Sequence, residues 1–153
     1  MLSMKNPRID RSVWGPGPWD DEDDVYLWSA YGTLCGINRH IYLGHLCGYS
    51  IIPRGHPLYG ATGLSHHPLN DSKECPWGGI TFVNTGRLLD LDCLPSNQRI
   101  VGFDCAHCDD FCPGYPHHLI SDLGGCGQVY RDFHFVKNEC EKLAKLIQER
   151  RLP

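Results

Sequence analysis

The clearest pattern of apolar positions lies near the C-terminal end of the chain. Between residues 133 and 147 apolar side chains recur every three or four positions, which is the spacing of one face of an α-helix. These positions are Phe133, Val136, Cys140, Leu143, Leu146 and Ile147. Asp132 stands just before them and is a residue type that caps helices. We therefore predict an amphipathic helix that begins after Asp132 and packs on a sheet.

Upstream of this helix, the apolar residues form short runs rich in β-branched and aromatic side chains, as strands do. We predict strands over residues 25–35, 41–52, 79–83, 88–94 and 99–103. Two long loops, residues 53–78 and 104–127, concentrate His, Cys, Gly and Pro. The pattern indicates an α+β fold, with a small antiparallel or mixed sheet, long loops and the C-terminal helix packed on the sheet.

Residues 1–24 differ from the rest of the chain in composition. They contain the run Gly15-Pro16-Gly17-Pro18 and an acidic block, and Gly and Pro interrupt both helices and strands. We predict an acidic arm over residues 1–24, followed by one domain over residues 25–153. Trp14 and Trp19 favour packing of this arm on the domain or on a partner, because exposed tryptophans are uncommon.

Length and charge narrow the classes of function. A chain of 153 residues suits one domain, and its formal charge of −4 argues against binding a nucleic-acid polymer through a basic face. Most of that charge lies in the arm, so the domain itself stays compatible with small anionic ligands. No apolar run approaches the ~20 residues of a membrane span, and no secretory signal is present. We therefore expect a cytoplasmic protein without a membrane partner.

The chain contains nine cysteines, an odd number that does not suit a secreted disulfide framework. We interpret them as reduced thiols. The candidate ligands for a structural zinc are Cys105, Cys108, Cys112 and Cys126, with His117 or His118 in place of the last. The alternative is that these thiols fill the core, since free cysteine is among the most buried residue types.

The segment after the last predicted strand also carries candidate catalytic residues. Asp104, His107 and Asp110 combine two carboxylates with an imidazole that titrates near neutral pH. Such a trio suits acid–base chemistry or metal binding. It also suits turn capping, in which Asp and His side chains bond nearby main-chain groups.

A wider set of residues in the two loops suits a ligand pocket. Aromatic rings stack on a base, while His, Gly and Arg meet phosphate or ribose. The candidate ligand-binding residues are His56, Tyr59, Trp77, Gly78, Gly79, Thr81, His107 and Arg131. The chain has no P-loop, G-x-G-x-x-G, H-E-x-x-H or G-x-S-x-G motif, so the commonest nucleotide-binding and hydrolase assignments do not apply.

The order of several short motifs resembles a group of small uncharacterised proteins common in bacteriophage and prophage genomes. The motifs are Cys47-Gly48-Tyr49, Gly55-His56-Pro57-Leu58-Tyr59-Gly60, Gly78-Gly79-Ile80-Thr81-Phe82, Gly102-Phe103-Asp104-Cys105-Ala106-His107 and Tyr130-Arg131-Asp132, the last followed by Val136, Glu139 and Cys140. The chain departs from the group at Trp77, where the group has His, and at Cys108-Asp109, where it has Ala-Gly. Cys108 and Cys112 are therefore not features of the group.

The resemblance implies a virus-encoded accessory protein that acts in the cytoplasm of an infected bacterial cell. The group has no settled activity, so three functions stay open. The first is a counter-defence protein that binds and sequesters a small polar ligand such as a cyclic nucleotide signal. The second is a metal-assisted phosphodiesterase of such a ligand, and the third is an inhibitor that binds a host protein through the arm. A homo-oligomer is compatible with each of them.

Overall fold

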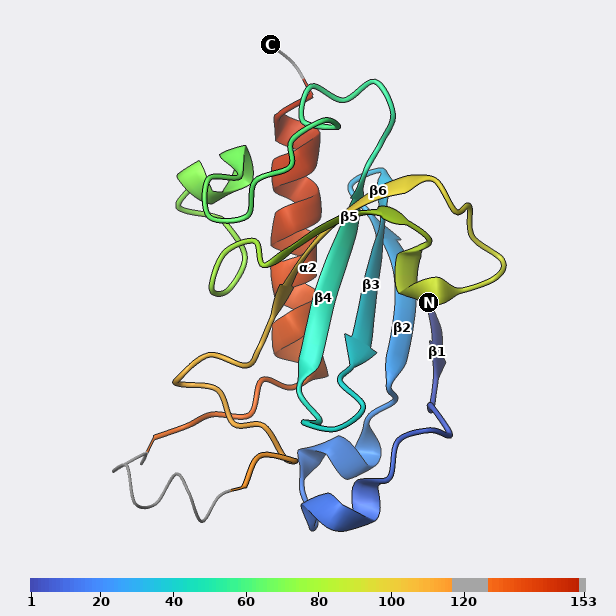
Figure 1. The fold of residues 1–153 in the computed structure, drawn as a ribbon, viewed down its shortest axis with the longest axis vertical. Helices are drawn as coiled ribbons and strands as arrows, with labels where there is room; N and C mark the ends of the chain where they lie inside the picture. Colours follow the sequence, from blue (N-terminus) through green and yellow to red (C-terminus); the bar gives the residue numbers. More distant parts are fainter. Residues whose placement is uncertain (117–126, 152–153) are drawn as a thin grey trace.

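The computed structural model describes residues 1–116 and 127–151, which form an antiparallel sheet with one long helix on one face (Figure 1). The sheet has six strands in the order β1-β2-β3-β4-β6-β5. The strands are β1 (Leu2–Met4), β2 (Val25–Ala30), β3 (Thr33–Arg39), β4 (Leu46–Ile52), β5 (Phe82–Gly86) and β6 (Gln98–Asp104), and the helix is α2 (Phe133–Glu149). The α+β fold class is thus confirmed, and of the two forms that the sequence left open, antiparallel and mixed, the sheet has the antiparallel one.

Helix α2 follows the prediction from its sequence pattern. The Asp132 side chain accepts a hydrogen bond from the main-chain N–H of Phe135 at 2.9 Å and caps the first turn. The apolar stripe is buried against β3 and β4, with Val136, Leu143 and Cys140 fully inaccessible to solvent. Burial of this stripe, more than intrinsic helix propensity, stabilises a helix of this length.

The first predicted strand, residues 25–35, is wrong as a single element because it contains a hairpin. Tyr31 and Gly32 have φ angles of 51° and 75°, and positive φ at both central positions defines a two-residue type I′ turn. This turn separates β2 from β3. The strand predicted over residues 41–52 begins only at Leu46.

The later strands are shifted or replaced. The strand predicted over residues 79–83 begins at Phe82 and extends to Gly86, whereas residues 99–103 lie within β6 as predicted. The strand predicted over residues 88–94 is wrong, because Leu88–Asp90 form the short 3-10 segment η4, in which the conformation of Leu89 is not helical (φ 57°). The segment places Leu88 against Ile51 and Ile100 on the sheet face opposite α2.

Residues 1–24 pack on the domain. β1 pairs with β2, and Trp14 and Trp19 lie on 3-10 helices, η1 (Arg11–Trp14) and η2 (Pro18–Asp21), with 9% and 4% of their surfaces exposed. Of the two alternatives that the sequence left open, packing on the domain or on a partner, the structure shows packing on the domain, although the composition of the arm did not indicate the strand β1.

A buried ion network joins the arm to the sheet. The Arg39 guanidinium, whose side chain is wholly buried, donates to Asp24 at 2.7 Å and to Glu22 at 2.9 Å. Arg11 also pairs with Asp24, and the Tyr130 hydroxyl donates to Glu22 at 2.6 Å. We call these five residues the Asp24 network. Burial alone would lower the pKa of Arg39, but Tyr130, Glu22 and Asp24 outweigh it and raise the pKa above its usual value.

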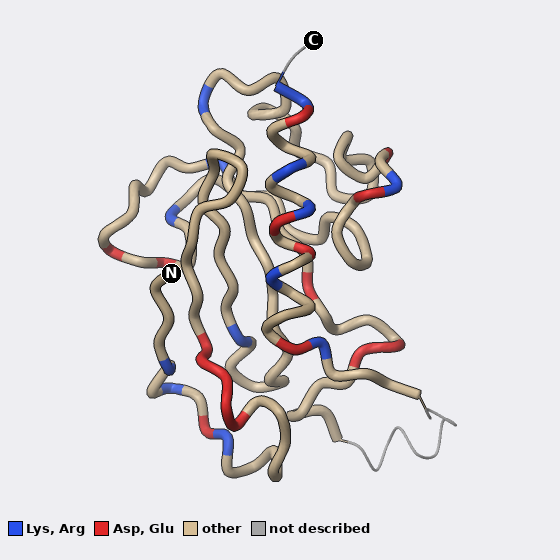
Figure 2. The backbone as a smooth tube through the Cα atoms, turned by 180° about the vertical axis from the view of Figure 1, so that it is seen from behind, with Lys and Arg blue, Asp and Glu red and all other residues tan. Residues whose placement is uncertain are grey.

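Charge is distributed unevenly along the molecule. Figure 2 shows a continuous acidic run at the end formed by residues 20–24, and mostly basic segments toward the opposite end, where the C-terminus of α2 lies. No helix in the described part of the chain is long and apolar enough to cross a membrane.

Candidate functional site

Three of the predicted ligand residues surround the buried carboxylate of Asp110. Asp110 accepts hydrogen bonds from Trp77 Nε1 at 3.1 Å, from Arg131 Nε at 2.9 Å and from His107. The Arg131 guanidinium also lies 4.3 Å from the centroid of the Trp77 ring, in a cation–π contact. We call Trp77, His107, Asp110 and Arg131 the Asp110 cluster.

The predicted catalytic trio is brought together at this cluster. Asp110 Oδ2 lies 3.0 Å from His107 Nδ1, and Asp104 Oδ1 lies 4.0 Å from His107 Nε2. About a third of the His107 side chain is exposed, whereas that of Asp110 is fully buried. The carboxylate of Asp110 orients the imidazole, and the second ring nitrogen faces Asp104. This is the geometry of an oriented acid–base histidine.

The environment keeps Asp110 ionised. Burial by itself would raise the pKa of Asp110, but hydrogen bonds from Arg131, from the His107 N–H and from Trp77 outweigh burial and lower the pKa below its usual value. The Arg131 charge is thereby neutralised within the cluster. An incoming anion would gain little from Arg131, although the sequence had suggested it as a phosphate ligand.

The absence of a side chain at Gly78 lets the His107 ring pack directly on the main chain. A Cβ atom at Gly78 would lie 2.2 Å from His107 Cε1, and the Gly78 φ of 71° belongs to the left-handed region that favours glycine. The groups that approach the Gly78-Gly79 main chain therefore belong to the protein itself: His107 lies against Gly78, and Asn70 lies against Gly79. Beyond His107, Gly78, Gly79 and Thr81 line an open hollow of about 700 Å³ with Ser65 and Asn70.

The candidate zinc ligands do not form a metal site in the described part of the chain. Cys105 and Cys112 are buried, and the Cys112 thiol donates to the Cys105 carbonyl at 3.8 Å, whereas Cys108 is exposed. Within residues 1–116 and 127–151, no group of three or more His, Cys, Asp or Glu side chains is arranged to hold a metal ion. The fourth candidate ligand, Cys126, lies outside the described residues, as do His117 and His118.

His56 and Tyr59 lie apart from the Asp110 cluster. His56 Nε2 bonds the carbonyl of Ile147 at 2.7 Å, and Nδ1 accepts from the N–H of Leu58 at 3.0 Å. Trp77, by contrast, bonds Glu139 through its main-chain N–H at 3.0 Å. Eight residues of α2, or about 12 Å along the helix axis, separate Glu139, which Trp77 contacts, from Ile147, which His56 contacts. His56 thus anchors its loop to α2, and both of its ring nitrogens are occupied.

Tyr59 lines a separate cavity that the sequence did not indicate. This cavity, of about 380 Å³, has Arg54, Asn97, Gln98 and Arg99 around the Tyr59 ring. A second hollow of about 310 Å³ shares Arg54 with it and adds Arg151 and His56. We call the first cavity the Tyr59 pocket. Isolated arginines form no sequence pattern; the only available signal was the proximity of Arg54 to the Gly55-His56-Pro57 motif.

The Tyr59 pocket also differs from the Asp110 cluster in its available charge. Arg54, Arg99 and Arg151 pair with no carboxylate among the described residues. Arg99 instead donates to Thr85 Oγ1 at 3.2 Å and to the Ala61 carbonyl. The Tyr59 pocket therefore keeps positive charge available to a ligand, whereas the cluster does not.

Buried His45 gives the protein a pH dependence. Burial, with a smaller contribution from His40, lowers the pKa of His45 to about 4, although Asp104 and Asp110 oppose the shift. Because the unfolded chain then binds more protons between pH 4 and 6.5, stability falls as the pH decreases through this window. We expect a loss of about 2 kcal/mol between pH 7 and pH 5 from this residue. Urea unfolding at both pH values measures the loss, and His45→Phe should reduce it by that amount; an unchanged loss in the variant would contradict the assignment.

Comparisons with known proteins provide no relatives for this chain. No family model matches it, and neither the curated proteins nor the solved structures contain a match.

Proposed function

We propose that this protein binds and sequesters a small anionic ligand, a phosphorylated nucleoside in chemical class, in the Tyr59 pocket. The observation that carries the proposal is the set of guanidinium groups without carboxylate partners around an aromatic ring. Guanidinium groups bind phosphate oxygens through paired hydrogen bonds, and the exposed face of a tyrosine stacks on a base. The cavity volume lies within the range of small-ligand sites.

Binding is favoured over catalysis at this pocket because no free acid–base group lines it. His56 uses both ring nitrogens within the protein, and the remaining polar side chains are amides, guanidinium groups and the Tyr59 hydroxyl. Sequestration of a cyclic nucleotide signal during phage infection would fit such a pocket. The support for this biological context is the motif order that resembles phage proteins.

Hydrolysis at the Asp110 cluster is the second candidate function. The contact of Asp110 with His107 Nδ1 leaves Nε2 facing Asp104 and solvent, as a general base requires. This site would act on a ligand without help from Arg131, because the Arg131 charge is already paired.

Calorimetric titration of the purified protein tests the proposed binding. The probes are 3′,5′-cyclic AMP, AMP, a cyclic dinucleotide and inorganic phosphate. We expect at least one nucleotide to bind more tightly than phosphate alone and to be recovered intact by chromatography. Arg54→Gln should weaken this binding at least tenfold, because a charged hydrogen bond contributes about 1.5–3 kcal/mol.

Arg8→Gln is the matched control, because Arg8 is exposed and its side chain makes no hydrogen bond or ion pair with the described residues. The control should bind as the unmodified protein does. Recovery of a cleaved ligand, abolished by His107→Gln, would favour hydrolysis. Absence of nucleotide binding, or equal weakening by Arg8→Gln and Arg54→Gln, would contradict the proposed function.

A further inference from the structure

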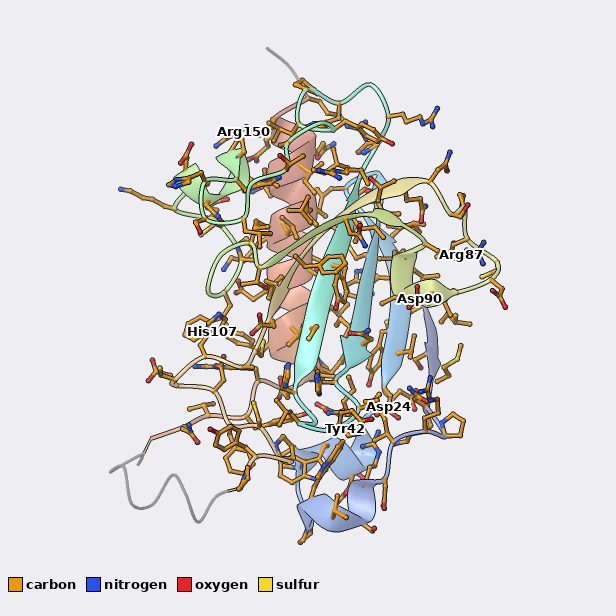
Figure 3. All side chains as sticks on the ribbon, in the orientation of Figure 1. Asp24, Tyr42, Arg87, Asp90, His107 and Arg150 are labelled. Carbon is orange, nitrogen blue, oxygen red and sulfur yellow. The ribbon has the colours of Figure 1, made fainter. Side chains whose placement is uncertain are left out.

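A further cavity lies on the sheet face opposite α2. Its volume is about 300 Å³, and it is bounded by β3, β4, β5, β6 and the segment 86–90. Its side chains combine rings, amides and opposite charges: Asn38, Tyr49, Phe82, Asn84, Arg87 and Asp90. We call it the Tyr49 pocket. Figure 3 shows Arg87 and Asp90 at the opposite edge of the molecule from His107, so this pocket is distinct from the Asp110 cluster.

Two glycines make room for side chains that line this pocket. Tyr49 and Phe82 are both register partners of Gly102, and their rings meet edge to face with centroids 5.4 Å apart. A Cβ atom at Gly102 would lie 2.5 Å from the Tyr49 ring, and one at Gly36 would lie 2.9 Å from Leu89. The absence of both side chains lets the ring of Tyr49 and the side chain of Leu89 lie close to the strands.

Several polar groups of the pocket have no partner among the described residues. The Asn38 amide and the Asp90 carboxylate make no hydrogen bond or ion pair with residues 1–116 or 127–151, and Asn84 uses only Oδ1, which accepts from Thr85. Arg87 Nε is buried and unpaired, although Nη1 of the same side chain bonds Asp92 at 2.9 Å. A buried donor without an acceptor is destabilising, and a ligand acceptor would remove that penalty.

The main chain beside these groups has an unusual conformation. Leu89 and Asp90 are consecutive residues other than glycine, with φ angles of 57° and 54°. Positive φ is unfavourable for residues with a side chain, and such conformations recur in ligand clamps. The packing of Leu89 against Gly36 and of Leu88 against Ile51 holds this segment over the sheet.

We propose that the Tyr49 pocket binds an uncharged planar heterocycle with both donors and acceptors on its edge, a nucleobase or nucleoside in chemical class. The aromatic wall provides a surface for the ring, and the amides of Asn38 and Asn84 each donate and accept, as base recognition requires. The volume suits one base and not a dinucleotide. Asp90 and Asp92 offset the charge of Arg87, so a phosphate gains nothing here.

This site is independent of the proposed function. Ile51 lines the Tyr59 pocket and Ile100 lines the Tyr49 pocket, and both pack with Leu88 in one apolar cluster, but the two pockets share no lining residue. A variant in one pocket should therefore leave binding at the other unchanged.

Titration of the isotope-labelled protein with adenosine, guanosine, cytidine and uridine, followed by amide NMR, tests the proposal. We expect saturable shifts at Asn38, Asn84 and Leu89 with at least one nucleoside. Asn84→Ala should weaken that binding about tenfold, and Tyr49→Leu should weaken it further. Asn138→Ala, an exposed change on α2, is the matched control and should bind as the unmodified protein does.

Three results would overturn the proposal. The first is the absence of shifts at these amides with every nucleoside, and the second is shifts centred on Arg54 and Tyr59. The third is equal affinity of Asn84→Ala and the unmodified protein. Because Asn84 is exposed, its replacement should not unfold the chain, and unchanged spectra elsewhere will verify this. The Arg54→Gln variant, which tests the Tyr59 pocket, should keep full nucleoside affinity.

Discussion

Replacement of Asp24 by Ala is expected to lower the free energy of unfolding by about 3–5 kcal/mol. The change leaves the Arg39 guanidinium buried, with only Glu22 as a charged partner, and removes the acceptor of Asn6 N–H at 2.7 Å. Small domains are stable by about 5–15 kcal/mol, so the loss is a large fraction of the total. Urea unfolding monitored by circular dichroism measures it.

Two further variants make this result interpretable. Asp24→Asn keeps the shape of the side chain and one hydrogen-bond acceptor, so it should lose less stability than Asp24→Ala. It can therefore be measured even if the Ala variant does not fold. Asp92→Ala removes the exposed partner of Arg87 and should produce no measurable change. Equal stability of the Asp24 and Asp92 variants would show that the Asp24 network contributes nothing.

We also expect removal of residues 1–24 to destabilise the sheet, because Trp14, Trp19 and Asp24 leave with them.

Replacement of Asp110 by Ala is the second change with a large expected effect, also about 3 kcal/mol or more. It removes the acceptor of Trp77 Nε1 and of the His107 main-chain N–H, and it leaves Arg131, 15% exposed, without its carboxylate. Urea unfolding gives the loss of stability. The indole N–H resonance of Trp77 should also move, which reports the broken contact directly.

The pH dependence provides an independent test of the same residue. Because the folded pKa of Asp110 lies below its unfolded value of about 3.8, its stabilisation is present above that pH and is lost as the pH falls through the folded pKa. Asp110→Asn should therefore lose less stability in strong acid than the unmodified protein. An identical acid transition would contradict the ionised state of Asp110. Asp109→Asn, an exposed neighbouring change, is the control.

The parts of the fold that the sequence predicts are those encoded locally. The cap at Asp132 and the apolar stripe of α2 lie within one segment, so their pattern is visible without knowledge of the fold. The turn at Tyr31 was hidden because tyrosine rarely adopts positive φ. The strand predicted at 88–94 failed because packing on the open sheet face, which depends on strands far away, determines the conformation of Leu88–Asp90.

The candidate sites, too, were predictable where their residues are close in sequence and unpredictable where they are not. Asp104, His107 and Asp110 lie within seven residues, so their proximity in space was predictable from their proximity in sequence. His56 and Trp77 were grouped as one ligand site, yet they contact opposite parts of α2, because the path of a long loop is set by tertiary contacts. The arginines of the Tyr59 pocket and the amides of the Tyr49 pocket come from separate elements and leave no motif.

The contact between Glu22 and α2 has a consequence for the order in which the elements fold. Glu22 accepts from the Phe133 main-chain N–H at 2.8 Å, across 111 residues of sequence, at the first turn of the helix. The hairpin of β2 and β3 can form early from nearby residues, but the sheet face that α2 covers stays exposed until α2 docks on it. Contacts of such long sequence separation slow folding. We therefore expect the hairpin to form before the core closes, with the apolar face of the sheet exposed in the interval.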